Sequence, residues 1–171
     1  MLSGRIFLIG MPGSGKSTLG QQLANHFKMN FIDLDVQIVK LIGKSIASIF
    51  DDEGEEHFRK LETESLKQIC QYPGDFVLAT GGGTPCFHNN MEFINESGTS
   101  IYLDVPIQEI NNRLINSELA SRPLFNKWPE SEMEAKLAKQ RHERSKFYKQ
   151  ANYTLSGSQI SLESLISILN K

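Results

Sequence analysis

Residues 10–17 read GMPGSGKS, the pattern G-x-x-x-x-G-K-[ST] of a phosphate-binding loop, or P-loop. Glycines let such a loop turn its backbone N–H groups inward around phosphate oxygens, because no Cβ blocks a positive φ. The helix that follows adds the positive end of its dipole. In this pattern Lys16 meets the β- and γ-phosphates, and the Ser17 hydroxyl suits Mg²⁺. The motif predicts a nucleotide site made by Gly13, Ser14, Gly15, Lys16, Ser17 and Thr18. We expect Lys16 to supply charge there and to contribute nothing to the core.

The flanking sequence has the order that this motif requires. Residues 5–9, RIFLI, form a short apolar run that is typical of a buried strand. Residues 16–28 carry Leu19, Leu23 and Phe27 at helical spacing. The alternative is a glycine-rich turn that binds nothing, but this alternative does not explain why Lys16 and Ser17 stand at the positions that the motif requires.

Composition narrows the function classes. The 171 residues are 39% hydrophobic and 22% charged, as in a single globular domain, and the net charge of −2 argues against an electrostatic nucleic-acid binder. No stretch approaches the ~20 apolar residues of a membrane span, and the chain enters its first strand without room for a signal peptide. We therefore expect a cytoplasmic protein. Cys70 and Cys86 form no C-x-x-C pair, and Cys86 is read as an ordinary small residue or, alternatively, as a catalytic thiol.

Strand patterns alternate with helix patterns along the rest of the chain. Further strands are expected at 30–33, 76–79, 100–105 and 152–155, and helices at 35–41, 45–50, 55–71, 91–96, 106–115, 131–148 and 162–169, with Ser131 and Glu134 as a capping box for the helix at 131. This alternation predicts an α/β fold with a five-stranded parallel sheet and helices on both faces. Ligands of such sheets bind at the carboxyl ends of the strands. That rule gathers the P-loop, Asp33, Asp35 and Gly81–Gly83 at one rim.

Two carboxylates close the second predicted strand. Asp33 and Asp35 are two positions apart, and in a strand such residues face the same side. One could hold Mg²⁺ through water while the other accepts a proton from a substrate hydroxyl. Alternatively, Asp35 caps a helix and Asp33 is merely solvated.

Glycines and arginines supply the remaining candidates. Gly81–Gly83 follow a buried strand, where they could admit a ligand close to the backbone or could simply form a flexible connection. Arg59, Arg122 and Arg144 carry guanidinium groups that suit carboxylates and phosphates, although each alone also fits a surface position.

Taken together, these residues resemble the shikimate kinase family over nearly the whole chain. The similarity rests on the P-loop, the D-x-D at 31–35 (FIDLD), the segments at 45–50 (SIASIF), 54–55 (GE) and 58–62 (FRKLE), the glycine motif at 80–83 (TGGG), RPL at 122–124, and Arg144 followed by Tyr148. The segment from 45 to 62 is the most specific, because generic P-loop kinases lack it. Residues 145–146 depart from the family, which often has a proline there, and residues 125–129 (FNKWP) align with nothing in it.

The resemblance implies a fold and a set of roles. The fold would be a three-layer α-β-α P-loop kinase, like the nucleoside monophosphate kinases, in one domain with a core (1–32, 63–113, 130–171), a substrate-binding segment (33–62) and a mobile lid (114–129). Asp35 would be the base at the acceptor hydroxyl. The shikimate carboxylate and ring would be held by Arg59, Arg144 and the backbone of Gly81, Gly82 and Gly83, with Phe50 and Phe58 flanking the ring. On the nucleotide side, Ser17 would bind Mg²⁺ directly and Asp33 through water. Arg122 would swing in on the lid to neutralise phosphate charge, and Arg113 would contact the adenine side.

The activity implied is ATP-dependent phosphorylation of the 3-hydroxyl of shikimate, with Mg²⁺ and with ATP as co-substrate. Two alternatives stay open: a kinase of another small acid such as gluconate, and a nucleotide-binding regulatory module without catalysis. Arg59 and Arg144 fit the carboxylate of either acid, whereas Phe50 and Phe58 favour the cyclohexene ring of shikimate. The intact Lys16, Ser17, Asp33 and Asp35 argue against a regulatory module without catalysis. We expect a monomer that binds neither nucleic acid nor membrane.

Overall fold

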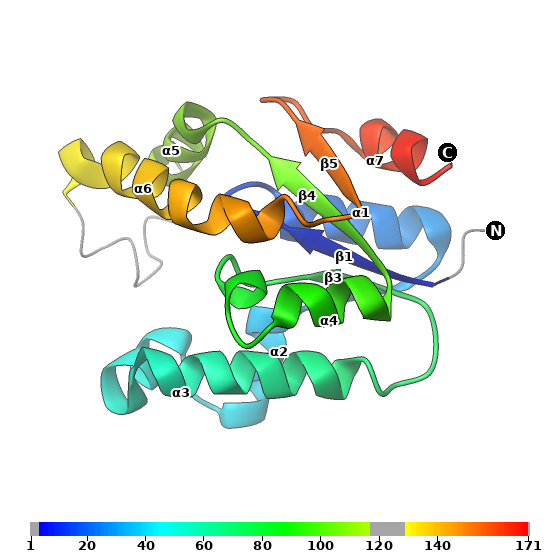
Figure 1. The fold of residues 1–171 in the computed structure, drawn as a ribbon, viewed down its shortest axis with the longest axis horizontal. Coiled ribbons are helices and arrows are strands. Elements are labelled where there is room, and N and C mark those ends of the chain that lie inside the picture. The colour runs from blue at the N-terminus through cyan, green and yellow to red at the C-terminus, as the bar shows by residue number, and fades with distance from the viewer. Residues whose placement is uncertain (1–3, 117–128, 171) are drawn as a thin grey trace.

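A five-stranded parallel sheet forms the centre of the molecule in the computed structural model, which describes residues 4–116 and 129–170. The strand order is β2-β3-β1-β4-β5, and Figure 1 labels β3, β1, β4 and β5 of this sheet. The strands are β1 (Arg5–Ile9), β2 (Asn30–Asp33), β3 (Phe76–Ala79), β4 (Thr99–Asp104) and β5 (Tyr153–Ser156). Each strand pairs in parallel with its neighbours, as expected when helices connect consecutive strands. The predicted α/β fold class is confirmed.

Helices cover both faces of the sheet because alternate strand residues point to opposite sides. Ile6 and Leu8 pack with α1 (Lys16–Phe27) and α7 (Leu162–Leu169) on one face. Phe7 and Ile9 belong to the core on the other face, which includes residues of the remaining helices (Figure 1). Those helices are α2 (Leu34–Ile42), α3 (Ile46–Ile69), α4 (Asn90–Ser97), α5 (Ile107–Asn116) and α6 (Glu130–Tyr148). None of the helices within 4–116 and 129–170 has the length and apolar character to cross a bilayer.

The sheet brings the two glycine-containing loops together. β1 and β3 are adjacent and in level register, with Leu8 opposite Ala79. The P-loop follows β1 and the Gly81–Gly83 segment follows β3, so both loops leave the same rim. This is the arrangement that the carboxyl-end rule predicted.

Three local features test the sequence analysis: one expectation was wrong, one was confirmed, and one short element was not predicted. Ser131 does not cap α6, because the chain enters that helix one residue earlier, at Glu130, with Pro129 at the N-cap position and no side-chain cap. The two helices expected at 45–50 and 55–71 are confirmed: both lie within α3, where non-helical geometry at Gly54 (φ 84°, ψ 169°) separates them. The 3-10 helix η1 (Thr84–Cys86) was not predicted, since a three-residue element has no readable periodicity.

Candidate active site

The P-loop has the backbone that its glycines allow. Gly10, Gly13 and Gly15 have φ of 146°, 80° and 95°, values that side chains rarely adopt, and α1 begins directly after Gly15. A Cβ on Gly10 would also lie 2.8 Å from the carbonyl oxygen of Leu103. Strand, loop and helix therefore follow one another as predicted, with the helix N-terminus at the rim.

Lys16 is more integrated in the fold than expected. Its side chain is buried, at 8% exposure, and Nζ donates hydrogen bonds to the carbonyl oxygens of Gly10 (3.0 Å) and Met11 (2.9 Å). The expectation that Lys16 contributes nothing to the core was wrong, because the ammonium ties the two ends of the loop to one another. In this motif the lysine ammonium meets the β- and γ-phosphates of the nucleotide.

Ser17 and Asp33 meet across the space between α1 and β2. Ser17 Oγ donates to Asp33 Oδ2 over 2.6 Å. The other carboxylate oxygen of Asp33 accepts from the backbone N–H of Val36 (3.3 Å) and caps α2. A hydroxyl and a carboxylate are hard oxygen donors of the kind that Mg²⁺ prefers, and Mg²⁺ usually completes its shell with water and substrate phosphates. The described ranges hold no cluster of three or more His, Cys, Asp or Glu that would bind a metal alone.

Asp35 reaches the rim by a route that the sequence analysis did not foresee. β2 ends at Asp33 and Asp35 lies in the first turn of α2, so the argument from strand alternation does not apply to it. The capping alternative was also wrong, because Asp33 is the N-cap. Asp35 nevertheless lies beside the glycine motif, since a Cβ on Gly81 would be 3.0 Å from Asp35 Oδ1. A partly exposed carboxylate thus borders the space between α2 and the Gly81–Gly83 segment.

Arg59 is a buried cation held by two glutamates of its own helix. Nη1 donates to Glu62 Oε2 over 2.6 Å, and Nη2 donates to Glu55 Oε1 over 3.0 Å. Burial alone would lower the pKa of Arg59, but the two carboxylates outweigh it and raise that pKa, so the guanidinium stays charged. The same group touches Gly83, where a Cβ would collide with it. The Arg59 guanidinium carbon also lies 4.5 Å from the ring centroid of Phe87.

Two further rings pack near Arg59. Phe50 and Phe58 have centroids 4.7 Å apart, and the Arg59 guanidinium lies 5.9 and 5.3 Å from them. The rings contact each other, so a ligand could meet them only on an outer face. Their contact with a bound acceptor stays a prediction.

Arg144 also lies beside the glycine motif. It lies on α6, and its Nη1 would be 3.1 Å from a Cβ on Gly82. Among residues 4–116 and 129–170 it forms no ion pair with a carboxylate. One turn later, Tyr148 is fully buried and its hydroxyl donates to the Gly82 carbonyl oxygen. Burial raises the pKa of Tyr148 far above its ordinary value, so this hydroxyl remains a donor.

The three glycines of the motif serve the packing of side chains. None of them has a positive φ. Side chains instead occupy the space where each Cβ would stand: Glu62, Thr84 and Asp35 at Gly81, Pro12 and Arg144 at Gly82, and Arg59 at Gly83. The site's own side chains thus approach this backbone closely, and the approach of a ligand to it stays a prediction. Pro12 also places the P-loop directly against the motif.

A buried polar network behind the motif escaped the sequence analysis. Glu62, at 1% exposure, accepts from Arg59 and from Thr84 Oγ1, the latter over 2.6 Å. Asn90 Nδ2 then donates to the Thr84 carbonyl oxygen (2.9 Å) and to Thr63 Oγ1 (3.0 Å). A signal existed for Glu62, because it lies three residues after Arg59 on a helix, a spacing at which opposite charges pair. Nothing local pointed to Thr84 or Asn90.

Cys86 and Arg113 lie at the two edges of the site. Burial raises the pKa of Cys86 to about 11, despite the nearby charges of Arg144 and Arg59, so the thiol is protonated near neutrality. This disfavours the catalytic-thiol interpretation. Arg113 lies beside the P-loop, donating to the carbonyl oxygens of Gly13 (3.4 Å) and Ser158 (3.1 Å). Arg122 and most of the predicted lid lie outside the described residues.

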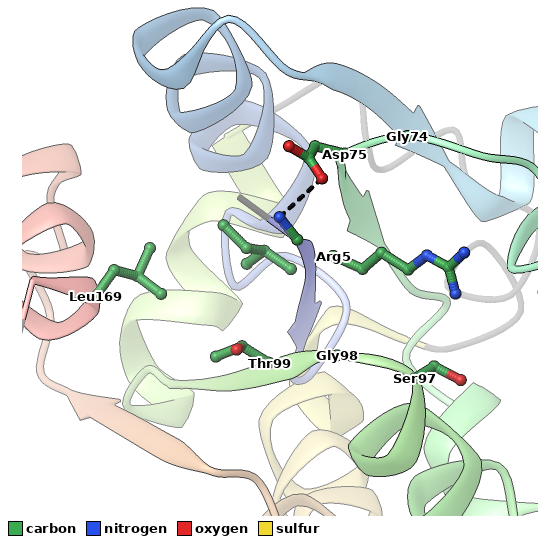
Figure 2. A pocket seen from close by; sticks show the side chains of 9 residues that line it. Arg5, Gly74, Asp75, Ser97, Gly98, Thr99 and Leu169 are labelled. Carbon is green, nitrogen blue, oxygen red and sulfur yellow. Dashed lines mark hydrogen bonds between the residues drawn. The ribbon is translucent and has the colours of Figure 1, made fainter. Parts of the chain in front are cut away.

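A hollow of about 530 Å³ lies at the other end of the sheet. Arg5, Asp75 and Thr99, at or just before the amino ends of β1, β3 and β4, help to line it (Figure 2). Its charged groups already have partners, since Asp75 accepts from the Gly4 N–H and Arg5 donates to the Tyr72 carbonyl. The convergent charged groups are at the carboxyl rim.

Comparison with known proteins agrees with this geometry. A family model described as shikimate kinase matches residues 12–170. A shikimate kinase of Azobacteroides pseudotrichonymphae is 41% identical over 165 residues, which are 96% of each chain. The crystal structure of shikimate kinase from Bacteroides thetaiotaomicron superposes with a TM-score of 0.93 at 32% identity, covering 99% of this chain and 100% of that one. Shikimate kinase from Acinetobacter baumannii in complex with shikimate gives a TM-score of 0.85 at 32% identity, covering 98% and 90%. As the sequence analysis predicted, the chain belongs to the shikimate kinase family.

Proposed function

We propose that this chain transfers the γ-phosphoryl group of ATP to the 3-hydroxyl of shikimate and forms shikimate 3-phosphate, a step toward chorismate and the aromatic amino acids. One observation carries the proposal beyond family membership. Arg59 and Arg144 are 85 positions apart, yet Arg59 lies against Gly83 and Arg144 lies against Gly82, which also touches Pro12 of the P-loop. Two guanidinium groups beside one short backbone segment suit the carboxylate of a small acid.

The acceptor would lie between α2, α3 and α6. Its carboxylate would meet Arg144, which lacks a described carboxylate partner, and the buried guanidinium of Arg59. Asp35, beside Gly81, would accept the proton of the reacting hydroxyl. Phe50 and Phe58 would present one apolar wall to the ring. In this arrangement the acceptor hydroxyl faces the P-loop, which touches the glycine motif through Pro12.

The nucleotide would bind across the P-loop. Its phosphates would accept hydrogen bonds from the loop N–H groups, Lys16 and Thr18, while Arg113 would lie toward the adenine. Ser17 and Asp33 would hold Mg²⁺, Asp33 through water, and the bound ion would neutralise phosphate charge. Catalysis would consist mainly of positioning and of charge stabilisation during in-line transfer. Arg122, on the proposed lid at 114–129, would add a further positive charge.

The proposal includes the division of the chain into a core (1–32, 63–113, 130–171), a substrate-binding segment (33–62) and the lid. It also includes a monomeric, cytoplasmic enzyme. Size-exclusion chromatography with light scattering tests the oligomeric state, and a dimer at micromolar concentration would contradict it.

A turnover assay tests the activity. Purified protein with ATP and Mg²⁺ should phosphorylate shikimate, while gluconate and a no-acceptor control should show at most background ADP release. ³¹P and ¹H NMR of the product should show a phosphate ester at the 3-hydroxyl. Preference for gluconate, or ATP hydrolysis that is indifferent to shikimate, would overturn the proposal.

A further inference from the structure

A second charged cluster lies at the carboxyl rim, centred on Asp104 at the end of β4. Oδ1 of Asp104 accepts from Arg141 Nη2 (2.5 Å) and from the Tyr102 hydroxyl (2.8 Å), and Oδ2 accepts from Ser156 Oγ (3.3 Å). Burial alone would raise the pKa of Asp104, but Arg141 and the hydroxyl groups outweigh it and hold that pKa below its ordinary value. The carboxylate is therefore ionised and fully engaged at neutral pH. The proposed mechanism gives no role to either member of this ion pair.

The ion pair attaches α6 to the sheet at one point, and Tyr148 attaches it at another. Arg141, Arg144 and Tyr148 are spaced by three and four residues, so they share one face of the helix. Arg141 is bonded to β4 through Asp104, and the Tyr148 hydroxyl is bonded to the Gly82 carbonyl oxygen. Arg144 lies between these two attachments.

Tyr102 connects the two attachments directly. Its hydroxyl donates to Asp104, and its ring packs on that of Tyr148 with centroids 5.1 Å apart. The face of α6 that carries Arg144 is thus fixed by a continuous set of contacts from β4 to the glycine motif.

Arg144 needs this external support more than Arg59 does. Arg59 is oriented by its own ion pairs with Glu55 and Glu62, whereas the described residues offer Arg144 no carboxylate partner. The orientation of Arg144 therefore depends on how α6 is seated on the rim. Displacement of a binding group by about 1 Å can cost on the order of 10²-fold in rate.

We infer that Asp104 and Arg141 are positioning residues for the acceptor: their ion pair seats α6 so that Arg144 meets the acceptor carboxylate. The inference rests on the proposed function, because it is defined by shikimate binding. The ion pair is expected to affect shikimate binding, and neither nucleotide binding nor the reacting hydroxyl. Its kinetic effect can therefore be distinguished from the effects of variants in the P-loop or at Asp35.

The test is Asp104→Asn, which keeps the shape of the side chain and removes its charge. We expect KM for shikimate to rise roughly five- to tenfold, with KM for ATP within twofold of wild type. Calorimetry of shikimate binding without nucleotide should show the same loss. In an Arg144→Ala background, Asp104→Asn should add less than a twofold change, because the residue through which it acts is gone.

Two further variants complete the experiment. Lys136→Gln breaks a different ion pair of α6, with Glu132 (2.8 Å), and should leave both KM values unchanged. Arg141→Gln should reproduce Asp104→Asn, and it replaces that variant if the latter does not fold. If the wild-type protein phosphorylates shikimate but Asp104→Asn and Arg141→Gln leave KM for shikimate unchanged, this inference alone is overturned. It is also overturned if Asp104→Asn raises KM for shikimate by the same factor in the Arg144→Ala background as in wild type. A wild-type protein that neither binds nor phosphorylates shikimate overturns the proposed function and this inference with it.

Discussion

The nucleotide side and the acceptor side of the rim are assembled differently. The nucleotide side is one contiguous loop, residues 10–17, whose backbone follows from its glycines and whose lysine bonds to the loop's own carbonyls. The acceptor side is assembled from α2, α3, the glycine motif and α6. Its groups are held by side chains distant in sequence, such as Glu62 with Thr84. The difference shows that a local motif can specify a phosphate site, whereas a small-acid site depends on how the elements pack.

The largest expected effect falls on the nucleotide side. Lys16→Met should lower kcat/KM roughly 10³-fold or more, since a preorganised charge at the transferred phosphate is lost. It should also lower the melting temperature modestly, because the carbonyls of Gly10 and Met11 lose their donor, a loss of about 1–3 kcal/mol. Activity assays and thermal unfolding measure the two effects. The control is Lys67→Met, on the exposed surface of α3, for which neither quantity should change. Retained turnover in Lys16→Met would refute the P-loop assignment.

Asp35→Asn should affect chemistry more than binding of either substrate. An amide keeps the shape but cannot take the proton of the hydroxyl, and general-base catalysis contributes roughly 10²–10⁴-fold. We expect kcat to fall in that range, while the affinity for ATP changes little. Steady-state kinetics with both substrates varied provides the measurement. A kcat within a few-fold of wild type would show that Asp35 is not the base.

Within the acceptor side, variants of Arg59 and Arg144 should have the same effect on shikimate binding and different effects on stability. Arg59→Ala and Arg144→Ala should each raise KM for shikimate about tenfold or more, because charge-assisted hydrogen bonds to a carboxylate contribute roughly 1.5–3 kcal/mol each. KM for ATP should barely move. The variants should differ in stability: Arg59→Ala leaves the buried Glu62 without its ion-pair partner, at a cost of about 3 kcal/mol, whereas no described carboxylate depends on Arg144.

Two comparisons control this prediction. Lysine should rescue either position poorly, since a point charge does not replace a planar fork. The double variant should cost less than the sum of the single variants, as both residues would bind one carboxylate. If both variants weakened ATP binding alone, the acceptor would have been assigned to the wrong side of the rim.

The smallest expected effect concerns pH and the seating of α6. The pKa of Asp104 lies below its ordinary value of 3.8 in the folded protein, so its ionised form favours folding above that pH and the contribution is lost as pH falls through the folded pKa. The melting temperature of wild type should exceed that of Asp104→Asn by a constant margin above about pH 5, and the margin should shrink below about pH 4. The carboxylate is partly exposed, so the margin should also decrease in high salt. A margin that is independent of pH would mean that the charge of Asp104 does not stabilise the fold.

Prediction from the sequence succeeded where the signal was local. The strands at 5–9, 30–33 and 76–79 and the helix at 162–169 have the expected bounds, because apolar runs and periodic stripes mark elements buried against a sheet. It failed at Asp35, because strand alternation was extended two residues too far, past the N-cap at Asp33. It failed at Ser131 for a similar reason, since the start of a helix can shift by one residue without changing its pattern.

The phosphate loop follows from residue types at fixed short spacing, and the parallel sheet that carries it follows from the alternation of strand and helix patterns along the chain. The tertiary structure decided that Arg59 and Arg144 meet at one glycine segment. It also decided that Glu62 is fixed by Thr84 and that α6 is seated by Asp104. The physical reason is that charge pairs and hydrogen bonds act over a few ångströms in space, whatever the distance along the chain. The sequence shows which side chains are able to form ion pairs and hydrogen bonds, and the packing of the fold determines which of them do.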